Sequence, residues 1–260
     1  MTDNRWVHSS ELTRYRLAPN PGPMSLDGTN SYVLGAQGQA GAVVVDPGPL
    51  DATHLQELAA AGQIELVLIT HHHPDHTEGS AEFHRLTGAP VRALDPALCF
   101  DAPALADGEL IEAAGVRIEV LATPGHTADS VSLHLADDDG GRGSVVTGDT
   151  ILGRGTTVIS YPDGRLGDYL ASMRRLEELG QKTVLPAHGP VLPDLAAVAR
   201  AYIAHREERL GQIRAALARL GQDAPAGDVT DLVYADVDPS VRRAAELSVA
   251  AQLDYLRGWV

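Results

Sequence analysis

The residues best suited to chemistry lie between Thr70 and His76, in the sequence Thr-His-His-His-Pro-Asp-His. Four histidines and one carboxylate fall within six successive positions. Imidazole rings are costly to bury without partners, and adjacent rings repel each other once they are protonated. A divalent cation removes both costs, because it keeps the rings neutral and binds their free nitrogens. The spacing therefore predicts a metal site.

The donor atoms of this segment indicate which kind of metal site to expect. Histidine nitrogen and carboxylate oxygen suit zinc, and the segment contains no thiolate. Such a site is catalytic rather than structural when it leaves a position open for water. A zinc-bound water has a pKa of about 7, so it supplies a nucleophile at neutral pH. The chemistry to expect is metal-dependent hydrolysis.

Apolar segments predicted as strands precede this motif and four other turns that carry His or Asp. Residues 64–69 lead into the motif itself. The other four pairs are residues 42–45 before Asp46, 116–121 before His126, 144–146 before Asp149, and 183–185 before His188. These side chains can converge only if the strand ends share one edge of a sheet, or the common edge of two sheets. Small residues beside them let the backbone approach closely.

The order of elements predicts an α/β fold of the α+β type, with mixed sheets covered by helices. Further strands are expected at residues 31–34 and 131–135, and helical spacing appears at residues 52–61, 80–87, 168–179 and 194–220. Strands come in runs as well as in alternation with helices. Beyond Leu192 helical patterns replace strands. We therefore expect a catalytic domain at residues 1–192 and a small helical domain at residues 193–260.

The pattern His71-x-His73-x-Asp75-His76, followed by His126, Asp149 and His188, resembles the metallo-β-lactamase superfamily. The resemblance implies a four-layer αβ/βα sandwich with a dinuclear site at one edge, usually holding two Zn²⁺, with Mn²⁺ or Fe²⁺ as alternatives. By position, it implies a first metal bound by His71, His73 and His126, a second bound by Asp75, His76 and His188, and Asp149 bridging both. Asp75 would also orient the attacking water and carry a proton during catalysis.

Four further segments are similar to the β-lactamase-like protein 2 subfamily: residues 20–24, 28–32, 149–157 and 204–206. That subfamily includes an endoribonuclease and is related to polyketide thioesterases. The resemblance implies a winged-helix-like C-terminal domain. The residues expected near the substrate are Asn20, Met24, Asn30, Arg154, Thr156 and Thr157.

Several residues keep two interpretations on sequence grounds. Asp46 begins Asp-Pro-Gly, so it is either a turn former or an acceptor for a ligand imidazole. Arg154 either holds a phosphate or carboxylate of the substrate or forms a surface salt bridge. His72 points away from its neighbours in an extended segment, which favours a role in the wall of the site. The remaining histidines, including His54 and His205, are expected at the surface or in helix packing.

Charge and composition restrict the partners of the chain. The formal net charge is −15 and the pI is near 5.0, which argues against a general affinity for nucleic acid or for anionic membranes. Local binding of RNA at a metal site stays open. The single cysteine, Cys99, fits a reducing compartment. Residues 1–10 are polar and no apolar run approaches the roughly 20 residues that span a bilayer, so we expect a cytoplasmic protein without a membrane partner.

Three substrate classes compete within the hydrolase prediction. They are a small-molecule or carrier-linked thioester or ester, single-stranded RNA, and a lactam or lactone. A non-enzymatic alternative is a nucleic-acid-binding or regulatory module that keeps the metal site for its shape. A di-iron redox protein is a further class, but His76 fits the hydrolase pattern better. The sequence leaves the oligomeric state open, a homodimer included.

Overall fold

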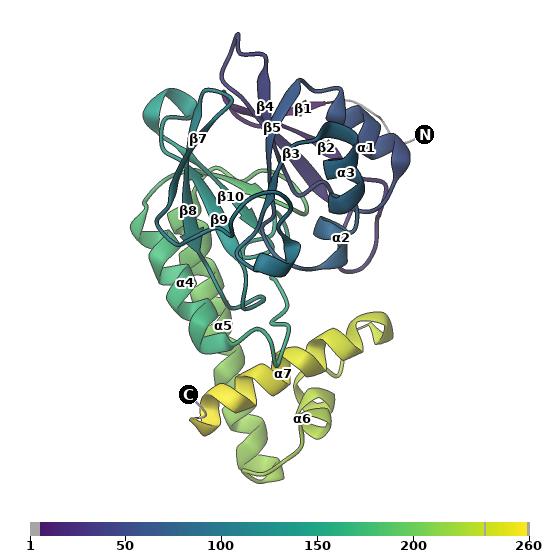
Figure 1. The fold of residues 1–260 in the computed structure, drawn as a ribbon. Coiled ribbons are helices and arrows are strands. Elements are labelled where there is room, and N and C mark those ends of the chain that lie inside the picture. The colour runs from purple at the N-terminus through teal and green to yellow at the C-terminus, as the bar shows by residue number, and fades with distance from the viewer. Residues whose placement is uncertain (1–5, 237, 259–260) are drawn as a thin grey trace.

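Two β-sheets facing each other form the centre of the upper part of the molecule in the computed structural model, which describes residues 6–236 and 238–258 (Figure 1). The first sheet has the order β1-β2-β3-β4-β5-β6. Strands β1 to β4 pair antiparallel, whereas β4, β5 and β6 pair parallel. The strands span Val7–His8 (β1), Thr13–Leu17 (β2), Asn30–Leu34 (β3), Gly41–Val45 (β4), Gln63–Leu68 (β5) and Val91–Arg92 (β6).

The second sheet is also mixed and has the order β11-β10-β9-β8-β7. Only β10 and β11 pair parallel in it. Its strands span Leu110–Ala113 (β7), Val116–Ala122 (β8), Val131–Leu135 (β9), Ser144–Gly148 (β10) and Thr183–Pro186 (β11).

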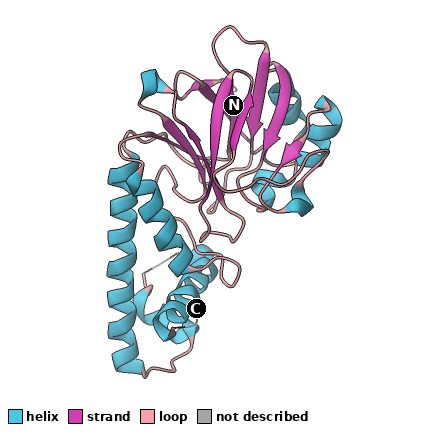
Figure 2. Cartoon of the chain, turned by 60° about the vertical axis from the view of Figure 1, so that its left-hand side comes forward, coloured by secondary structure: helices cyan, strands magenta, loops and turns pink. Residues whose placement is uncertain are grey.

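Helices cover the outer face of each sheet (Figure 2). On the first sheet lie α1 (Ala52–Ala59) and α3 (Ser80–Thr87), next to the single turn α2 (Pro74–Thr77). On the second sheet lie α4 (Leu166–Glu178) and the first half of α5 (Leu195–Leu220). This arrangement confirms the predicted αβ/βα sandwich of the α+β class.

Alternation of side chains along the strands explains why both faces of the first sheet are buried. Val43 and Val45 of β4 face the second sheet, in a core that includes Leu133. Val44, between them, faces the opposite way and packs with Leu58 of α1 and Phe83 of α3. Each fully buried side chain of this kind stabilises the fold by about 1.5–3 kcal/mol. A continuous apolar run is therefore required where a strand lies between two layers.

Strand direction brings the ends of the predicted strands to one edge. Strands β4 and β5 are parallel neighbours, so their carboxyl ends coincide. Strand β8 is antiparallel to β9, and β9 is antiparallel to β10, so β8 runs in the direction of β10 and its parallel partner β11. The turns that follow β4, β5, β8, β10 and β11 therefore meet at the common edge of the two sheets.

The long helix α5 belongs to both parts of the molecule. Near its start, Leu195 and Tyr202 pack in the core outside the second sheet. Near its end, Ile213 and Leu217 pack against α6 (Ala226–Val233) and α7 (Arg242–Arg257). The described part of residues 193–258 contains helices and no strand, so the winged-helix likeness stays a prediction. None of the described helices combines the length and apolar character needed to cross a bilayer.

Candidate metal centre

The backbone between β5 and α3 sets the direction of the motif histidines. Residue His73 is extended and is the N-cap of α2, and Pro74 begins the helix, where its missing N–H costs nothing. His71 and His73 are two residues apart and their rings meet, with centroids 4.7 Å apart. His72, between them, turns the other way and pairs with Asp129, its Nδ1 lying 2.8 Å from Oδ1.

One group of donors gathers around His73. Its Nδ1 lies 3.0 Å from Nε2 of His71 and 3.1 Å from Nε2 of His126. Together with a carboxylate oxygen of Asp149, these ring nitrogens lie within 4.8 Å of one another. Ring nitrogens this close suit a shared cation better than packing against one another.

A second group lies beside the first. Oδ2 of Asp75 is 3.2 Å from Nε2 of His188 and 3.7 Å from Nε2 of His76. One donor atom from each of these three residues lies within 4.8 Å of the donor atoms of the other two. Both histidines are fully buried, whereas the Asp75 side chain is 30% exposed.

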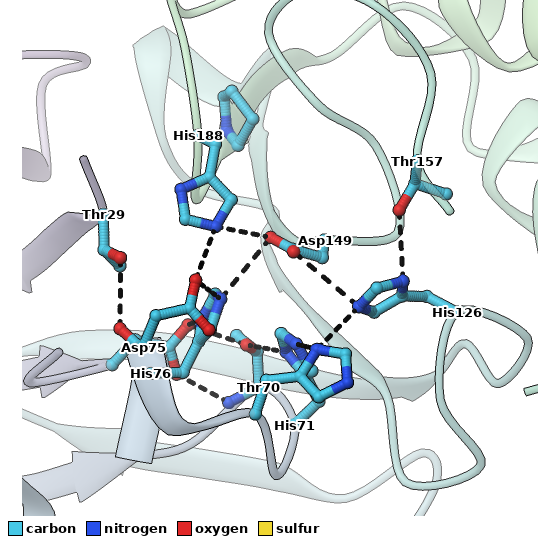
Figure 3. Close-up of polar contacts among 12 residues, drawn as sticks. Thr29, Thr70, His71, Asp75, His76, His126, Asp149, Thr157 and His188 are labelled. Carbon is cyan, nitrogen blue, oxygen red and sulfur yellow. Dashed lines mark hydrogen bonds and ion pairs between the residues drawn. The ribbon is translucent and has the colours of Figure 1, made fainter. Parts of the chain in front are cut away.

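Asp149 lies between the two groups (Figure 3). Its Oδ1 is 3.3 Å from Nε2 of His188 and 3.5 Å from Nε2 of His76. Its Oδ2 is 3.7 Å from Nε2 of His126. One carboxylate thus directs one oxygen to each group, which is the geometry that a bridging ligand requires.

Buried polar atoms without partners test whether a cation fits here. Among the described residues, Nε2 of His76, Nε2 of His188 and Oδ1 of Asp149 are buried and form no hydrogen bond. A buried polar atom left unpaired costs about 1–3 kcal/mol. These three atoms face one another, so a divalent cation would satisfy all of them, and the donor set fits zinc.

Asp46 holds the motif from behind. Its Oδ1 accepts a hydrogen bond from the backbone N–H of Thr70 at 2.8 Å. Its Oδ2 accepts from Thr70 Oγ1 at 2.7 Å and from Nδ1 of His76 at 2.9 Å. Thr70 Oγ1 lies 3.1 Å from Nδ1 of His71. Asp46 itself has a φ of 52°, so it both forms the turn and orients two ligand candidates.

His126 and His188 are also held through Nδ1, whereas His73 directs its Nδ1 toward the other donors. His126 donates to the carbonyl of Val158 at 2.6 Å, and Thr157 Oγ1 lies 3.2 Å from the same nitrogen. His188 donates to the carbonyl of Gly28 at 3.1 Å. Hydrogen bonds at Nδ1 leave Nε2 of each ring as the free donor toward a metal.

Protonation differs between the two groups. Burial, together with neighbouring His76, lowers the pKa of His71 well below its usual value. Burial and His126 lower the pKa of His73 to about 4, and burial lowers the pKa of His126. These rings are neutral at pH 7 and offer lone pairs.

Carboxylates reverse this effect in the second group. Burial works against a charged His188, but Asp149 and Asp75 outweigh it and raise the pKa of His188 to about 11. Burial is likewise outweighed at His76, whose pKa is raised by Asp46 and Asp149. The same contacts, chiefly with His188, lower the pKa of Asp149 well below its usual range despite burial. In the absence of a metal, protons on His188 and His76 therefore balance the negative charge of the carboxylates, as a bound cation would.

A cavity of about 320 Å³ opens beside the two groups and is bordered by His126 and Asp149. Four residues predicted near the substrate line it: Met24, Arg154, Thr156 and Thr157. Arg154 also forms an ion pair with Asp27, with N···O distances of 2.9 and 3.0 Å.

The sequence also predicts Asn20 and Asn30 near the substrate, but neither lines this cavity. Asn20 fixes its own loop, donating to Thr29 Oγ1 and accepting from the Thr29 N–H. Asn30 is buried and donates to the carbonyls of Pro186 and Gly189, both at 2.9 Å. The Asn30 amide thus joins the end of β11 and the loop after it to the first sheet.

Pocket residues from the C-terminal helices were not predicted. His205, Arg206 and Arg209 of α5 line the cavity, with Tyr234 beyond α6. One signal was present in the sequence. The buried face of α5 includes Tyr202, Leu210 and Ile213, and Arg206 falls in this stripe at the spacing of an apolar residue.

Comparisons with known proteins agree with this geometry. The model of the metallo-beta-lactamase superfamily matches residues 24–188. A beta-lactamase-like protein 2 homolog from Caenorhabditis elegans is 34% identical, over 95% of this chain and 84% of its own length. An atrochrysone carboxyl ACP thioesterase from Aspergillus fumigatus is 31% identical over 80% of this chain, which spans only 65% of that protein.

Solved structures show the same fold. A metallo-beta-lactamase family protein from Thermus thermophilus has a TM-score of 0.74 at 25% identity, covering 94% of this chain and 93% of its own. A beta-lactamase domain protein from Burkholderia ambifaria has a TM-score of 0.80 at 20% identity, covering 99% and 90%. With the family match and the gathered His and Asp side chains, these findings establish that the chain belongs to the metallo-beta-lactamase superfamily.

Proposed function

We propose that this protein is a metal-dependent hydrolase with a dinuclear centre, zinc being the first candidate metal and Mn²⁺ or Fe²⁺ the alternatives. The observation that carries the proposal is the position of Asp149. Its two carboxylate oxygens face two separate groups of histidines. A single-metal site would not need an oxygen directed to each group.

A pair of divalent cations, when bound, supplies a deprotonated water at neutral pH and polarises the bond to be cleaved. The side chains and carbonyls of the protein orient the ligand rings and carry the proton. Asp46, Val158 and Gly28 fix the ligand rings through Nδ1, so the site is ordered before substrate arrives. Asp75 is the partly exposed carboxylate of the centre, and we assign to it the proton transferred to the leaving group.

The favoured substrate is a small-molecule or carrier-linked thioester or ester. A cavity of about 320 Å³ suits a small acyl group, and its wall contains apolar side chains such as Met24, Leu26 and Leu152. A relative at 31% identity is named as an acyl carrier protein thioesterase. The second candidate is the phosphodiester of single-stranded RNA, favoured by the arginines at the same cavity.

The test is a screen of purified protein whose metal content has been measured. The substrates are glutathione thioesters, acyl-carrier thioesters, unstructured RNA and a chromogenic lactam. We expect thioester hydrolysis that disappears with a chelator and returns with zinc. Activity that survives complete metal removal would contradict the metal-dependent reaction. Binding of RNA without hydrolysis of any substrate would favour the non-enzymatic module instead.

The assignment of Asp75 has its own test. Asp75→Asn keeps the size of the side chain but cannot carry the proton. We expect a fall in kcat of about 100-fold or more, in the range of general acid–base catalysis. A variant that binds two metals and keeps full turnover would exclude this role for Asp75.

A further inference from the structure

Part of the wall of the cavity beside the metal centre carries positive charge that no ion pair balances. Three arginines line the cavity: Arg154, Arg206 and Arg209. Arg154 is balanced by Asp27. Within the described residues, neither Arg206 nor Arg209 forms an ion pair with a carboxylate, and their hydrogen bonds go to neutral oxygens. This is unusual in a protein whose formal net charge is −15.

Arg206 is the less easily explained of the two, because it is 3% exposed. It donates from Nη2 to the carbonyl of Thr157, and its guanidinium lies 5.2 Å from the ring centre of Tyr169. Its Nε is buried and has no hydrogen-bond partner in the described structure. A buried charge without a counter-ion costs several kcal/mol, so it is normally paired.

Arg209 lies one helical turn further along α5 and lines the same cavity wall. Its guanidinium stacks 4.8 Å from the ring centre of Tyr234, and Nη1 donates to Gln212 Oε1 at 2.7 Å. Beside the two arginines, His205 places Nε2 at 3.5 Å from Thr156 Oγ1. Burial and both arginines lower the pKa of His205, so the ring stays neutral and adds a hydrogen-bonding atom.

We propose that this wall binds an anionic oxygen group of the substrate, a carboxylate or a phosphate, at the end remote from the bond that is cleaved. Guanidinium groups bind both anions through paired N–H donors. Arg206 is two contacts from the metal centre, through Thr157 and then His126. Substrates with a charged end a few bonds from the scissile carbonyl therefore fit. The inference rests on the proposed hydrolysis, whose substrate class it narrows.

Two pairs of substrates test whether the bound anion is a carboxylate on the acyl side or a phosphate on the thiol side. The first pair is the glutaryl and valeryl thioesters of N-acetylcysteamine, which differ by a carboxylate on the acyl side. The second pair is acetyl-phosphopantetheine and acetyl-pantetheine, which differ by a phosphate on the thiol side. For the zinc-loaded protein, we expect kcat/KM to favour the charged member of at least one pair by about tenfold or more.

Arg209→Gln is the decisive variant, because Arg209 holds no backbone group. We expect it to reduce the preference to within about threefold. The matched control is Arg214→Gln, which removes the same charge from an exposed position of α5 and should leave rates and preference unchanged. Arg206→Gln should act in the same direction as Arg209→Gln, provided that its circular dichroism and thermal unfolding stay like those of the wild type.

The outcomes distinguish this inference from the proposed function. Hydrolysis of both pairs with no preference for charge, or a preference that Arg209→Gln leaves intact, would overturn the anion site alone. If no thioester is hydrolysed, the proposed reaction fails, and calorimetry with the two intact N-acetylcysteamine thioesters still tests the site, because the glutaryl thioester carries a free carboxylate and the valeryl thioester is neutral. Tighter binding of the glutaryl thioester that is lost in Arg209→Gln and kept in Arg214→Gln would support it. Equal binding of the two thioesters would overturn it.

Discussion

At the scale of single residues, the centre depends as much on the atoms behind the ligand candidates as on the ligands. Asp46 shows this, because one carboxylate fixes Thr70 and His76 and, through Thr70, His71. Its negative charge also favours a positive charge on the neighbouring His76. Loss of such outer contacts weakens metal affinity in comparable sites by about 10–100-fold.

Asp46→Asn should therefore weaken zinc binding by about 10–100-fold while the fold stays intact. The measurement is competition with a chelator of known affinity. The matched control is Asp51→Asn, which removes an equal charge from the N-cap of α1, where asparagine caps equally well. Equal zinc affinities in the two variants would show that Asp46 does not support the metal centre.

His54, which lies outside the metal centre, should make the stability of the fold depend on pH. Its side chain is buried and its Nε2 lies 2.9 Å from Ser31 Oγ. Burial, with Arg16 nearby, lowers the pKa of His54 to about 4, whereas an unfolded histidine titrates at about 6.5. The folded pKa is the lower one, so the stability is fully present above pH 6.5 and is lost as the pH falls toward 4.

His54→Gln removes that titration. Between pH 7 and pH 5, the metal-free wild type should lose about 2 kcal/mol more unfolding free energy than the variant. In this range the unfolded wild type binds a proton at His54 that the folded protein does not bind, and the variant has no such group. Urea unfolding at the two pH values measures the difference. Parallel pH dependence of the two proteins would contradict the assignment.

At the scale of elements, close backbone contacts place the turns that carry the candidate ligands. Gly125 precedes His126 and has a φ of 137°, and a Cβ there would lie 2.3 Å from Cα of Tyr169 in α4. Gly148 precedes Asp149, and a Cβ there would lie 2.7 Å from Thr70 Oγ1. In both turns, glycine lets one element approach the next closely enough to bring the ligand candidates together.

Gly125→Ala should destabilise the protein by more than about 3 kcal/mol, because the new Cβ would clash with the backbone of Tyr169, which cannot move aside. Gly180→Ala is the control, since Gly180 also has a positive φ, of 77°, but has open space around it. It should cost about 1–2 kcal/mol. Urea unfolding compares the two, and equal losses would mean that φ alone, without the close contact, requires glycine at position 125.

The strands and helices with continuous or periodic apolar patterns were predicted to within about two residues. The strand expected at residues 64–69 is observed at Gln63–Leu68, and the helix expected at residues 194–220 at Leu195–Leu220. Strands β1, β2, β6 and β7 were missed, because they are short or carry charged residues within the strand. The spacing of the motif indicated the metal centre. The spacing of Arg206 in the buried stripe of α5 indicates a buried arginine, but its place at the cavity depends on how α5 packs on the second sheet, which no local pattern encodes.

At the scale of the whole molecule, α5 connects the sandwich to the C-terminal helices and also shapes the cavity. Tyr202 of this helix accepts a hydrogen bond at its hydroxyl from the Leu152 N–H at 3.1 Å. The same hydroxyl donates toward the carbonyls of Gly155, at 2.9 Å, and Leu152, at 3.2 Å. The loop that borders the cavity is thus held by α5, the helix that also packs against α6 and α7.

Tyr202→Phe should release this loop and leave the core unchanged, since the ring still fills its place. The orphaned backbone groups should cost about 1–3 kcal/mol, and amide hydrogen exchange should rise in residues 152–157. Exchange in β4 and β5 should not change. The control, Tyr255→Phe, alters an exposed tyrosine of α7. Unchanged exchange in residues 152–157 would show that α5 does not hold the loop.

The most direct test of the dinuclear centre is anomalous diffraction at the zinc edge from crystals grown with excess zinc. We expect two peaks, one among His71, His73 and His126 and the other among Asp75, His76 and His188, with the carboxylate of Asp149 in contact with both. A single peak, or peaks only at surface histidines, would contradict the account.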